Sequence, residues 1–324
     1  MSLFICVVCG SSFSLPACSC GYEVPVTDNI WQFTDAPPIV TQGDGVHYIG
    51  YEEIGEHYSG VRKHIIEAWG DTIAAEIARL TERGVFLDLG CGDGAFAVPA
   101  AKRGVRVLAA DISNNMMRIL QQKAEHNGIT LHPHTTLCRM NALQPAIASD
   151  CIQTATCNSV LHLISRPEKV IAEIHRVLIK GGAFVFKDDM PGSASNEMND
   201  KSKAYTRLCN HMHKMYWDIL RAKGYAPKRY NWIYDRKGIC GGLFASREEI
   251  VIPWEHERVE KLKDGFLARF SGKGFSDQVD VPVLLHKDAL EKTLELTRVE
   301  YGDDYGETEV YWVEPDIKLT LYRK

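Results

Sequence analysis

A glycine-rich segment in the N-terminal half of the chain carries the residues best suited to bind a nucleotide. The apolar run Val85–Leu89 leads directly into Gly90, Gly92 and Gly94. Glycines let the backbone turn sharply and approach a ligand that side chains would exclude. About 20 residues further on, the next apolar run ends at Asp111, where a carboxylate could accept hydrogen bonds from a ribose diol. Together these features predict a nucleoside site at the carboxyl ends of two parallel strands.

The spacing of the glycines indicates which nucleotide is bound. Dinucleotide sites favour G-x-G-x-x-G, which leaves room for a pyrophosphate at a helix N-terminus. In this chain the third glycine comes one residue earlier, and the acids Asp88 and Asp93 flank the loop. Two carboxylates would repel a pyrophosphate but attract a cationic ammonium or sulfonium group. The loop therefore favours S-adenosylmethionine over NAD.

Four segments resemble, in chain order, the successive motifs of class I (Rossmann-like) S-adenosylmethionine-dependent methyltransferases. They are Asp88-Leu-Gly-Cys-Gly-Asp-Gly, Ala110-Asp-Ile-Ser, Asn158-Ser-Val-Leu-His-Leu and Arg176-Val-Leu-Ile-Lys-Gly-Gly. The resemblance implies an α/β fold with a doubly wound, mostly parallel seven-stranded sheet. Two positions depart from the family pattern: Asn141 replaces an acid, and Lys180 replaces a proline. Asn141 can still accept a hydrogen bond from an adenine amino group through its amide oxygen.

The resemblance also implies roles for residues of this chain. The glycine loop, with Gly90 and Gly92, is expected to hold the methionine part of the cofactor, and Asp111 its ribose. Asn141 is expected to touch the adenine, and Asn158 to line the reaction site. The expected cofactor-binding residues are Tyr58, Asp88, Gly90, Cys91, Gly92, Asp111, Ile112, Met116, Asn141, Ala142 and Asn158.

Four of the ten cysteines lie within the first twenty residues, as Cys6-x-x-Cys9 and Cys18-x-Cys20. Two such pairs can form the knuckles of a closed, structural zinc site. A metal would also supply folding energy to a segment too short to bury a core of its own. The segment resembles the zinc-ribbon modules of rRNA and tRNA methyltransferases, although those usually carry C-x-x-C in the second knuckle. The alternative is four reduced thiols in a small β-appendage.

Methyl transfer from a sulfonium is an in-line displacement, so the protein mainly aligns donor and acceptor and excludes water. A general base is needed only for an acceptor that must lose a proton. His162, at the end of the fourth predicted strand, is the candidate for this base. The alternative is a histidine that packs beside the cofactor. Asp188 and Asp189 follow the fifth strand and are expected at the same edge of the sheet.

The segment between Asp189 and a predicted helix capped by Asp288 exceeds what the sheet needs, and is predicted to form a largely helical cap that selects the acceptor. Between Lys201 and Lys237 it holds ten Lys and Arg residues against two acids, with interleaved aromatics. This pattern is typical either of a site for a stacked base or phosphate, or of a solvated helix face with buried aromatics. We therefore consider a small-molecule methyltransferase first. The alternatives are an RNA base methyltransferase that docks through the zinc module and the basic cap, and a non-catalytic cofactor-binding adaptor.

The composition is that of an ordinary globular protein: 324 residues, 45% hydrophobic, 24% charged, net charge −5. No apolar run approaches the roughly 18 residues needed to cross a bilayer, and no signal peptide is evident. We therefore expect a cytoplasmic location with reduced thiols and no membrane partner; nothing indicates an oligomeric state. The predicted domains are a zinc-binding ribbon at 1–34, a Rossmann-like core at 45–190, the cap at 191–285, and at 286–324 the last helix and terminal strands of the core, with strands at Arg298–Tyr301 and Ile317–Tyr322.

Overall fold

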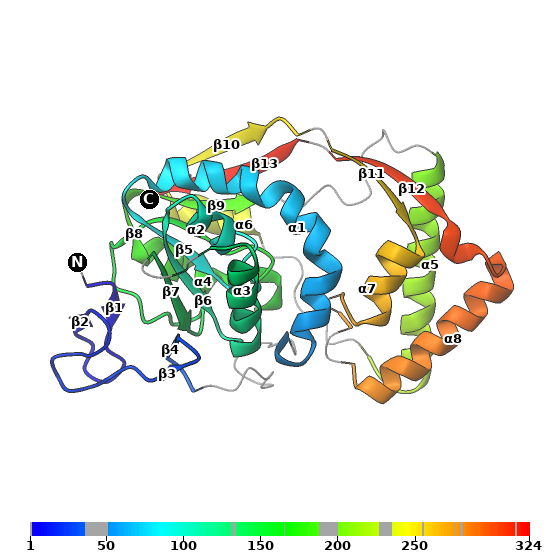
Figure 1. Ribbon diagram of the computed structural model, residues 1–324, viewed down its shortest axis with the longest axis horizontal. Coiled ribbons are helices and arrows are strands. Elements are labelled where there is room, and N and C mark those ends of the chain that lie inside the picture. The colour runs from blue at the N-terminus through cyan, green and yellow to red at the C-terminus, as the bar shows by residue number, and fades with distance from the viewer. Residues whose placement is uncertain are drawn as a thin grey trace. The chain divides into compact units, whose positions relative to one another are not determined.

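The computed structural model (Figure 1) describes residues 2–35, 51–129, 131, 134–164, 166–187, 200–226, 235–254, 256–275, 277–278, 281–314 and 316–324. Within this part of the chain the fold divides into two compact units. The first consists of Met1–Lys187, Tyr230–Ile250 and Lys318–Lys324. The second consists of Asp188–Arg229 and Val251–Ile317.

The first unit is built on a sheet with the strand order β10-β13-β9-β8-β5-β6-β7-β4-β3. Seven of these strands lie outside the N-terminal segment: β5 (Val85–Leu89), β6 (Arg106–Asp111), β7 (Thr135–Arg139), β8 (Ile152–Thr156), β9 (Leu178–Lys187), β10 (Ser246–Ile252) and β13 (Ile317–Arg323). The sequence did not predict β10, which lies in the segment expected to form the cap. The strands from β7 to β9 pair in parallel, whereas β13 runs antiparallel to β9. Every residue of β5 is buried, as expected for a parallel strand covered on both faces.

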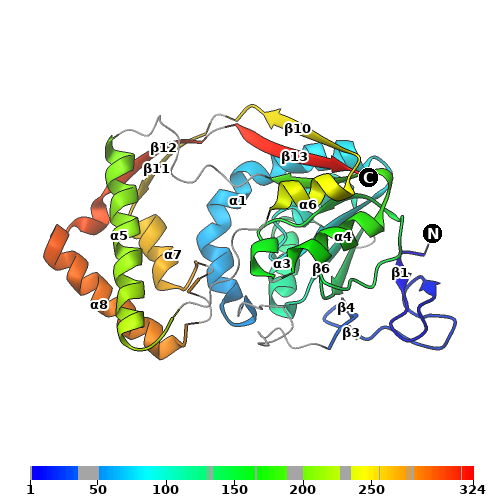
Figure 2. The ribbon, with the colours of Figure 1, turned by 180° about the vertical axis from the view of Figure 1, so that it is seen from behind.

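Helices cover both faces of this sheet. They are α1 (Tyr51–Thr81), α2 (Ala97–Lys102), α3 (Asn114–His126), α4 (Pro167–Val177) and α6 (Arg236–Leu243). Figure 1 shows α1 and α2 in front of the sheet, and Figure 2, from behind, shows α4 and α6. The doubly wound α/β fold is thus confirmed. α3 begins where the Ser113 hydroxyl accepts the N–H of Met116, and α4 begins at a first-turn proline.

The N-terminal segment forms two short hairpins that belong to the core of the first unit. They are β1 (Phe4–Ile5) with β2 (Ser12–Phe13), and β3 (Val26–Thr27) with β4 (Ile30–Gln32). β4 also pairs in parallel with β7, so the second hairpin extends the central sheet. Phe4 stacks on Phe33, with ring centroids 5.0 Å apart, and forms a β-bridge with Ile147. A segment of this length cannot enclose a core, so it shares that of its neighbour.

The second unit combines helices with a β-hairpin. Its elements are α5 (Asp200–Ala222), β11 (His256–Lys261), η2 (Lys263–Leu267), α7 (Ala268–Ser271), α8 (Val283–Tyr301), η3 (Tyr305–Glu307) and β12 (Glu309–Glu314). β11 and β12 pair antiparallel. Tyr216, Phe270 and Ala289 are fully buried at the core between α5, α7 and α8. In neither unit do the described residues include a helix that is both long and apolar enough to cross a membrane.

Helix α8 differs from its prediction at both ends. The segment Arg298–Tyr301 forms its last turns and not a strand, because a buried stripe from His286 to Thr297 continues the helical spacing. Pro282 precedes the first helical residue, so Asp288 lies inside the helix and does not cap it. The extra turn before Asp288 buries His286, which the prediction left outside the helix.

The division into units also differs from the predicted domain boundaries. Helix α8, predicted as part of the Rossmann-like core, belongs to the second unit. The segment Tyr230–Ile250, predicted within the cap, contributes α6 and the start of β10 to the first unit. The edge strand of the sheet, β10, therefore comes from the part of the sequence that follows α5, and it pairs next to β13.

His286 is buried in the second unit with partners on both ring nitrogens. The Tyr216 hydroxyl lies 2.7 Å from Nδ1, and the carbonyl of Ser271 lies 3.0 Å from Nε2. Because a carbonyl only accepts, Nε2 carries a proton, and in the neutral ring Nδ1 then accepts from the Tyr216 hydroxyl. Burial lowers the pKa of His286, and the charge of Lys273 lowers it further.

We expect the free energy of unfolding of the second unit to decrease as the pH falls below about 6.5, the ordinary pKa of histidine. The folded-state pKa is lowered, so the unfolded chain binds the proton first, and the contribution of neutral His286 is present only above this pH. The free energy of unfolding is measured by chemical denaturation at about pH 7.5 and about pH 5.5. Between these two pH values it should decrease more for the native chain than for His286→Gln. Equal losses in the two proteins would contradict this expectation.

Candidate functional site

The loop after β5 is folded against the end of β6 by its own backbone. The N–H groups of Gly90 and Cys91 both donate to the carbonyl of Ala110, at 2.7 and 3.1 Å. Gly90 and Gly92 have φ angles of +74° and +52°, which side-chain-bearing residues rarely adopt. The glycines therefore build a compact turn at the carboxyl edge of the sheet, the edge at which open α/β sheets bind ligands.

Asp111, at the end of β6, links the glycine loop to the start of α3. Its Oδ2 accepts the N–H of Gly92 at 2.8 Å, and its Oδ1 accepts the N–H of Ser113 at 2.9 Å. Burial raises the pKa of Asp111, although these two hydrogen bonds favour the ionised form. Each carboxylate oxygen has two lone pairs, so both can still accept a hydrogen bond from a ribose hydroxyl.

A second carboxylate, that of Glu52 on α1, reaches the same loop. Its Oε2 accepts the Ser113 hydroxyl at 2.6 Å and the N–H of Asn115 at 3.2 Å. Ser113 thus joins two carboxylates, since its N–H donates to Asp111. Sequence reasoning missed Glu52, because the two residues are 61 positions apart and no local pattern marks it. Ser113 does carry a signal, that of a helix N-cap.

The two acids that flank the glycine loop are both engaged by protein groups. Asp88 is 2% exposed, and it accepts the Thr156 hydroxyl at 2.9 Å and the N–H of Ala97 at 3.1 Å. Burial raises the pKa of Asp88 to about 7. Asp93 forms an ion pair with Lys123, with 2.6 Å between Oδ2 and Nζ. Lys123 thus neutralises Asp93, while burial and two protein hydrogen bonds engage Asp88, so the predicted attraction of both acids for a cation is reduced.

The other expected cofactor residues lie around these loops. Ile112 and Met116 are buried beside Asp111, and Met116 Cε would be 3.4 Å from a Cβ on Gly92. Asn141 follows β7, and its side-chain oxygen accepts a backbone N–H at 2.9 Å, leaving one lone pair for a ligand. Ala142 packs against the core. Three side chains that the sequence singled out lie outside the described residues: Tyr58, Asp188 and Asp189.

The end of β8 brings Asn158 beside the end of β9. Its Oδ1 accepts the N–H of Lys187 at 3.2 Å, whereas its Nδ2 is buried without a protein acceptor. Buried donors are rarely left unpaired, so this amide is suited to bind an acceptor atom of a ligand. His162 follows in the short helix η1 (Leu161–Leu163), where it is partly exposed between two buried leucines.

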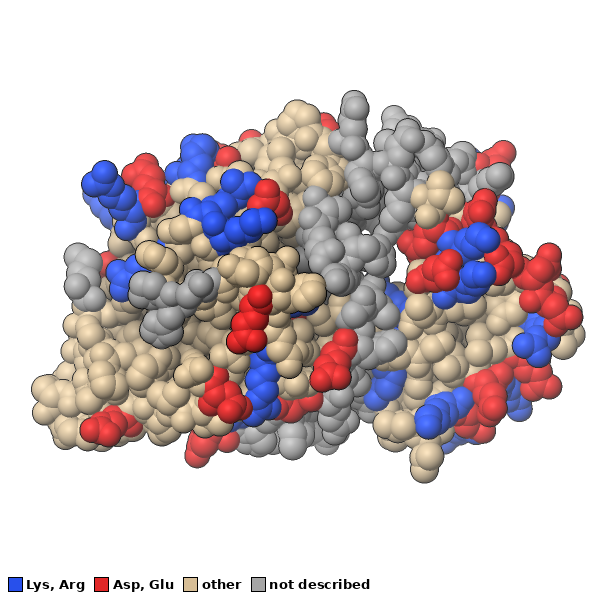
Figure 3. All heavy atoms as spheres, viewed as in Figure 1, with Lys and Arg blue, Asp and Glu red and all other residues tan. Residues whose placement is uncertain are grey.

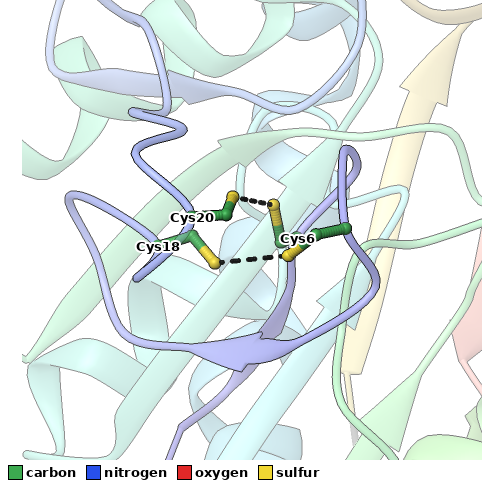
Figure 4. Close-up of side chains that lie close together, drawn as sticks. Cys6, Cys18 and Cys20 are labelled. Atoms are coloured by element: carbon green, nitrogen blue, oxygen red, sulfur yellow. Dashed lines mark hydrogen bonds between the residues drawn. The ribbon is translucent and has the colours of Figure 1, made fainter.

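The four N-terminal cysteines converge on one point (Figure 4). All four Sγ atoms lie within 4.8 Å of one another, with Cys6–Cys20 at 3.7 Å and Cys9–Cys18 at 3.6 Å. A tetrahedral zinc ion with bonds of about 2.3 Å needs sulfur–sulfur separations of about 3.8 Å. Hydrogen bonds from Ser11 lower the pKa of Cys9 to about 6, whereas the neighbouring Cys9 thiol raises the pKa of Cys20. The four thiols therefore fit zinc, and the C-x-C spacing of the second pair removes no ligand from the cluster.

Each cysteine pair is turned by a glycine. Gly10 and Gly21 have φ angles of +74° and +90°. Their N–H groups donate to the carbonyls of Cys6 and Cys18, each at 2.9 Å. A residue with a side chain would be strained in this conformation. The two glycines therefore make the tight turns that aim both thiols of each pair at one point.

The basic stretch of α5 is largely compensated within its own unit. Lys214 and Arg221 both form ion pairs with Asp218, and Lys223 pairs with Asp288. Figure 3 shows Lys and Arg side chains next to Asp and Glu side chains on the face that it presents. Three aromatic side chains of this stretch are buried: Tyr205, Tyr216 and Trp217. These residues favour the packed helix over a stacking platform; Tyr230, Trp232 and Tyr234 lie outside the described residues.

A comparison with known families identifies the domain around the glycine loop. Residues 87–186 match the sequence profile of a family described as "Methyltransferase domain". Within these residues the chain is thus similar to a methyltransferase domain. The matched residues run from β5 to β9, and so include the glycine loop, Asp111 and Asn158.

Individual relatives match about a third of this chain. A Geobacillus sp. (strain WCH70) protein that bears the name of a methyltransferase is 31% identical over 124 residues, 37% of this chain and 49% of that protein. The phosphatidylethanolamine N-methyltransferase of Cereibacter sphaeroides is 29% identical over 102 residues, 32% of this chain and 49% of that protein. Among solved structures, the YcgJ protein of Bacillus subtilis aligns with a TM-score of 0.47 at 14% identity, over 79% of this chain and 98% of that one. The chain spans about half the length of the curated relatives it matches.

Proposed function

We propose that the methyltransferase domain binds S-adenosylmethionine and transfers its methyl group, by in-line displacement, to a small-molecule acceptor. The observation that carries this proposal is the hydrogen bond between Asp111 and the glycine loop. Asp111 accepts the N–H of Gly92 while keeping lone pairs for a ribose diol. The third glycine of the loop, Gly94, comes one residue too early for the G-x-G-x-x-G pattern of pyrophosphate sites.

The residues of the chain have mainly to bind and align, because the transferred carbon is already activated in the cofactor. In this proposal the backbone at Gly90 and Gly92 holds the methionine end, Asp111 the ribose, and Asn141 the adenine. The buried Nδ2 of Asn158 supports a ligand contact at the adjoining strand end, since it has no protein acceptor. His162 would take up the proton of an acceptor that must lose one.

A small-molecule acceptor is supported by two observations. The relatives named above and others like them include ubiquinone biosynthesis O-methyltransferases and a phosphatidylethanolamine N-methyltransferase. Three described cations of α5, Lys203, Lys214 and Arg221, are paired with acids, and this reduces the charge available for a nucleic-acid backbone. An RNA acceptor would instead give salt-sensitive retention of RNA, and a non-catalytic adaptor would bind the cofactor without transferring its methyl group.

The proposal is tested by calorimetric titration with S-adenosylhomocysteine, and with NAD as the control. We expect dissociation constants in the micromolar range for S-adenosylhomocysteine and no measurable binding of NAD. A preference for NAD, or binding of neither, would refute the assignment of the glycine loop. Acceptor screening with labelled S-adenosylmethionine then separates the enzyme from the adaptor.

We also propose that Cys6, Cys9, Cys18 and Cys20 bind a structural zinc ion. A site with four protein ligands is closed, so the ion would stabilise the fold and take no part in methyl transfer. We expect about one zinc per chain by elemental analysis of protein purified without chelator. Replacing an exposed ligand, in Cys9→Ser, should lower the zinc content and the thermal stability of the N-terminal segment.

The matched control for Cys9→Ser is Cys151→Ser, which alters a thiol outside the cluster. Cys151 lies near the N-terminal segment, with its Sγ 3.0 Å from the carbonyl of Ala148, but contributes nothing to the group of four. Its zinc content should equal that of the native chain. A metal-free native protein with an intact N-terminal segment would exclude the zinc proposal.

A cytoplasmic location is also part of the proposal. All ten cysteines are free thiols in the structure, and this supports a reducing compartment.

A further inference from the structure

We infer that the N-terminal cysteine module, residues 2–35, is a supporting part of the cofactor site, so that metal and cofactor favour each other's binding. Asp28 and Gln32 of this module hold the start of α3, and α3 begins immediately after the loop of Asp111 and Ser113. The inference rests on the proposed role of Asp111 as the ribose ligand. In this inference the module stabilises the cofactor-binding loop of the methyltransferase domain.

The first line of support is a set of contacts between the module and α3. Gln32 Nε2 donates to Asn114 Oδ1 at 3.2 Å, and Asn114 Nδ2 donates back to Gln32 Oε1 at 3.4 Å. Asp28 contacts the next turn of this helix. Its carboxylate accepts Arg118 Nε at 2.8 Å, and its carbonyl accepts Gln121 Nε2 at 2.8 Å. The module therefore forms hydrogen bonds with the N-terminal half of α3, the helix that Ser113 caps.

The second line of support runs through the sheet. Gln32 on β4 is the register partner of Arg139 on β7, and Arg139 is in turn the partner of Asp111 on β6. The N–H of Phe33 also donates to the carbonyl of Arg139, at 3.0 Å. Arg139 Nε reaches the carbonyl of Ile112 at 2.9 Å, directly after Asp111. The hairpin of the module is thus one strand removed from the ribose loop.

The cysteine cluster is continuous with this hairpin. Cys6 and Cys18 are 2% and 5% exposed, and they share a hydrophobic cluster with Phe4 and Phe33. Phe33 follows β4 immediately, and Phe4 stacks on it. A zinc ion that fixes the four thiols would fix this cluster, and through it Gln32. Without the ion, the two short hairpins lose the energy that offsets the entropy of ordering them.

Coupling of this kind is reciprocal, which makes the test specific. The full chain is titrated with S-adenosylhomocysteine in the zinc-loaded state and after zinc removal, and zinc affinity is measured by chelator competition with and without S-adenosylhomocysteine. We expect S-adenosylhomocysteine to bind about fivefold to tenfold more weakly without zinc. Saturation with S-adenosylhomocysteine should tighten zinc binding by the same factor.

If the metal-free chain unfolds, the inference can still be tested with a variant that retains its zinc. The double variant Asp28→Asn/Gln32→Ala removes the ion pair with Arg118 and the amide pair with Asn114, but leaves the backbone contact of residue 28 with Gln121 and all four cysteines. Asn suits the φ of +52° at position 28. It should bind S-adenosylhomocysteine about threefold to tenfold more weakly at full zinc content. The control is Asp71→Asn, which breaks an exposed ion pair with Arg103 of 2.7 Å and should leave the affinity unchanged.

The outcomes separate this inference from the proposed function. Equal affinities for S-adenosylhomocysteine with and without zinc, and in the double variant, would overturn the inference and leave the methyltransferase proposal standing. Failure of the zinc-loaded native chain to bind S-adenosylhomocysteine would overturn both. Weaker binding in the double variant but not in Asp71→Asn would support the inference.

Discussion

Asp111→Ala is expected to weaken the binding of S-adenosylhomocysteine by at least about tenfold, because charge-assisted hydrogen bonds contribute about 1.5–3 kcal/mol. The substitution removes the proposed ribose acceptor and also the support for the N–H groups of Gly92 and Ser113. Affinity is best measured by calorimetry at one fixed pH, since burial raises the pKa of Asp111. The thermal stability of the variant is measured in parallel, to separate loss of binding from loss of fold.

Asp111→Asn makes the test more specific. Both carboxylate oxygens accept a backbone N–H, so the NH₂ group of Asn would face one of these donors whichever way the amide is turned. The Asn variant should therefore bind about as weakly as the Ala variant. Asp71→Asn, on the surface of α1, is the matched control and should retain native affinity. Unchanged affinity in both Asp111 variants would overturn the placement of the ribose.

Gly90→Ala is expected to be the most damaging single-methyl substitution in the glycine loop. Gly90 has a φ of +74°, and a Cβ there would lie 2.3 Å from Val160 Cγ2. The left-handed conformation costs an alanine about 1–2 kcal/mol. Overpacking a buried site costs about 1–3 kcal/mol more. The free energy of unfolding should therefore fall by about 2–5 kcal/mol, and cofactor binding should be lost as the loop is displaced.

Two further substitutions separate strain from steric clash. Gly104 has nearly the same φ, +76°, but open space around it, so Gly104→Ala should show only the cost of strain. In Gly90→Ala/Val160→Ala the clash is relieved, and part of the lost stability should return. If Gly90→Ala is no worse than Gly104→Ala, the close contact between Gly90 and Val160 does not hold in solution.

Much of the site could be predicted from sequence because its signals are local. A buried strand, a run of glycines and an acid at the next strand end are all read within about 30 residues. The same is true of the cysteine pairs, whose spacing within each pair is set by a single tight turn. Helix starts at Asn114 and Pro167 were also predictable, because a cap and a first-turn proline act on adjacent residues.

The rest depended on contacts between distant segments, for which local periodicity carries no information. Nothing near Glu52 indicates that it accepts the hydroxyl of Ser113, and nothing near Lys123 indicates that it neutralises Asp93. The charge pattern of the loop suggested two free acids, but in the tertiary structure Lys123 pairs with Asp93, and Thr156 and Ala97 donate to the buried Asp88. The segment Arg298–Tyr301 has a strand-like pattern but forms the end of helix α8, because the packing of this helix defines its buried stripe.

By itself the sequence predicted an α/β methyltransferase core, its glycine loop with Asp111, and four cysteines at metal-binding spacing. Only the tertiary structure decided that the cysteine module joins the central sheet through β4 and holds the start of α3. The physical reason is that local backbone preferences depend on neighbouring residues. Pairing of strand edges and charges depends instead on where the folded chain brings distant residues together.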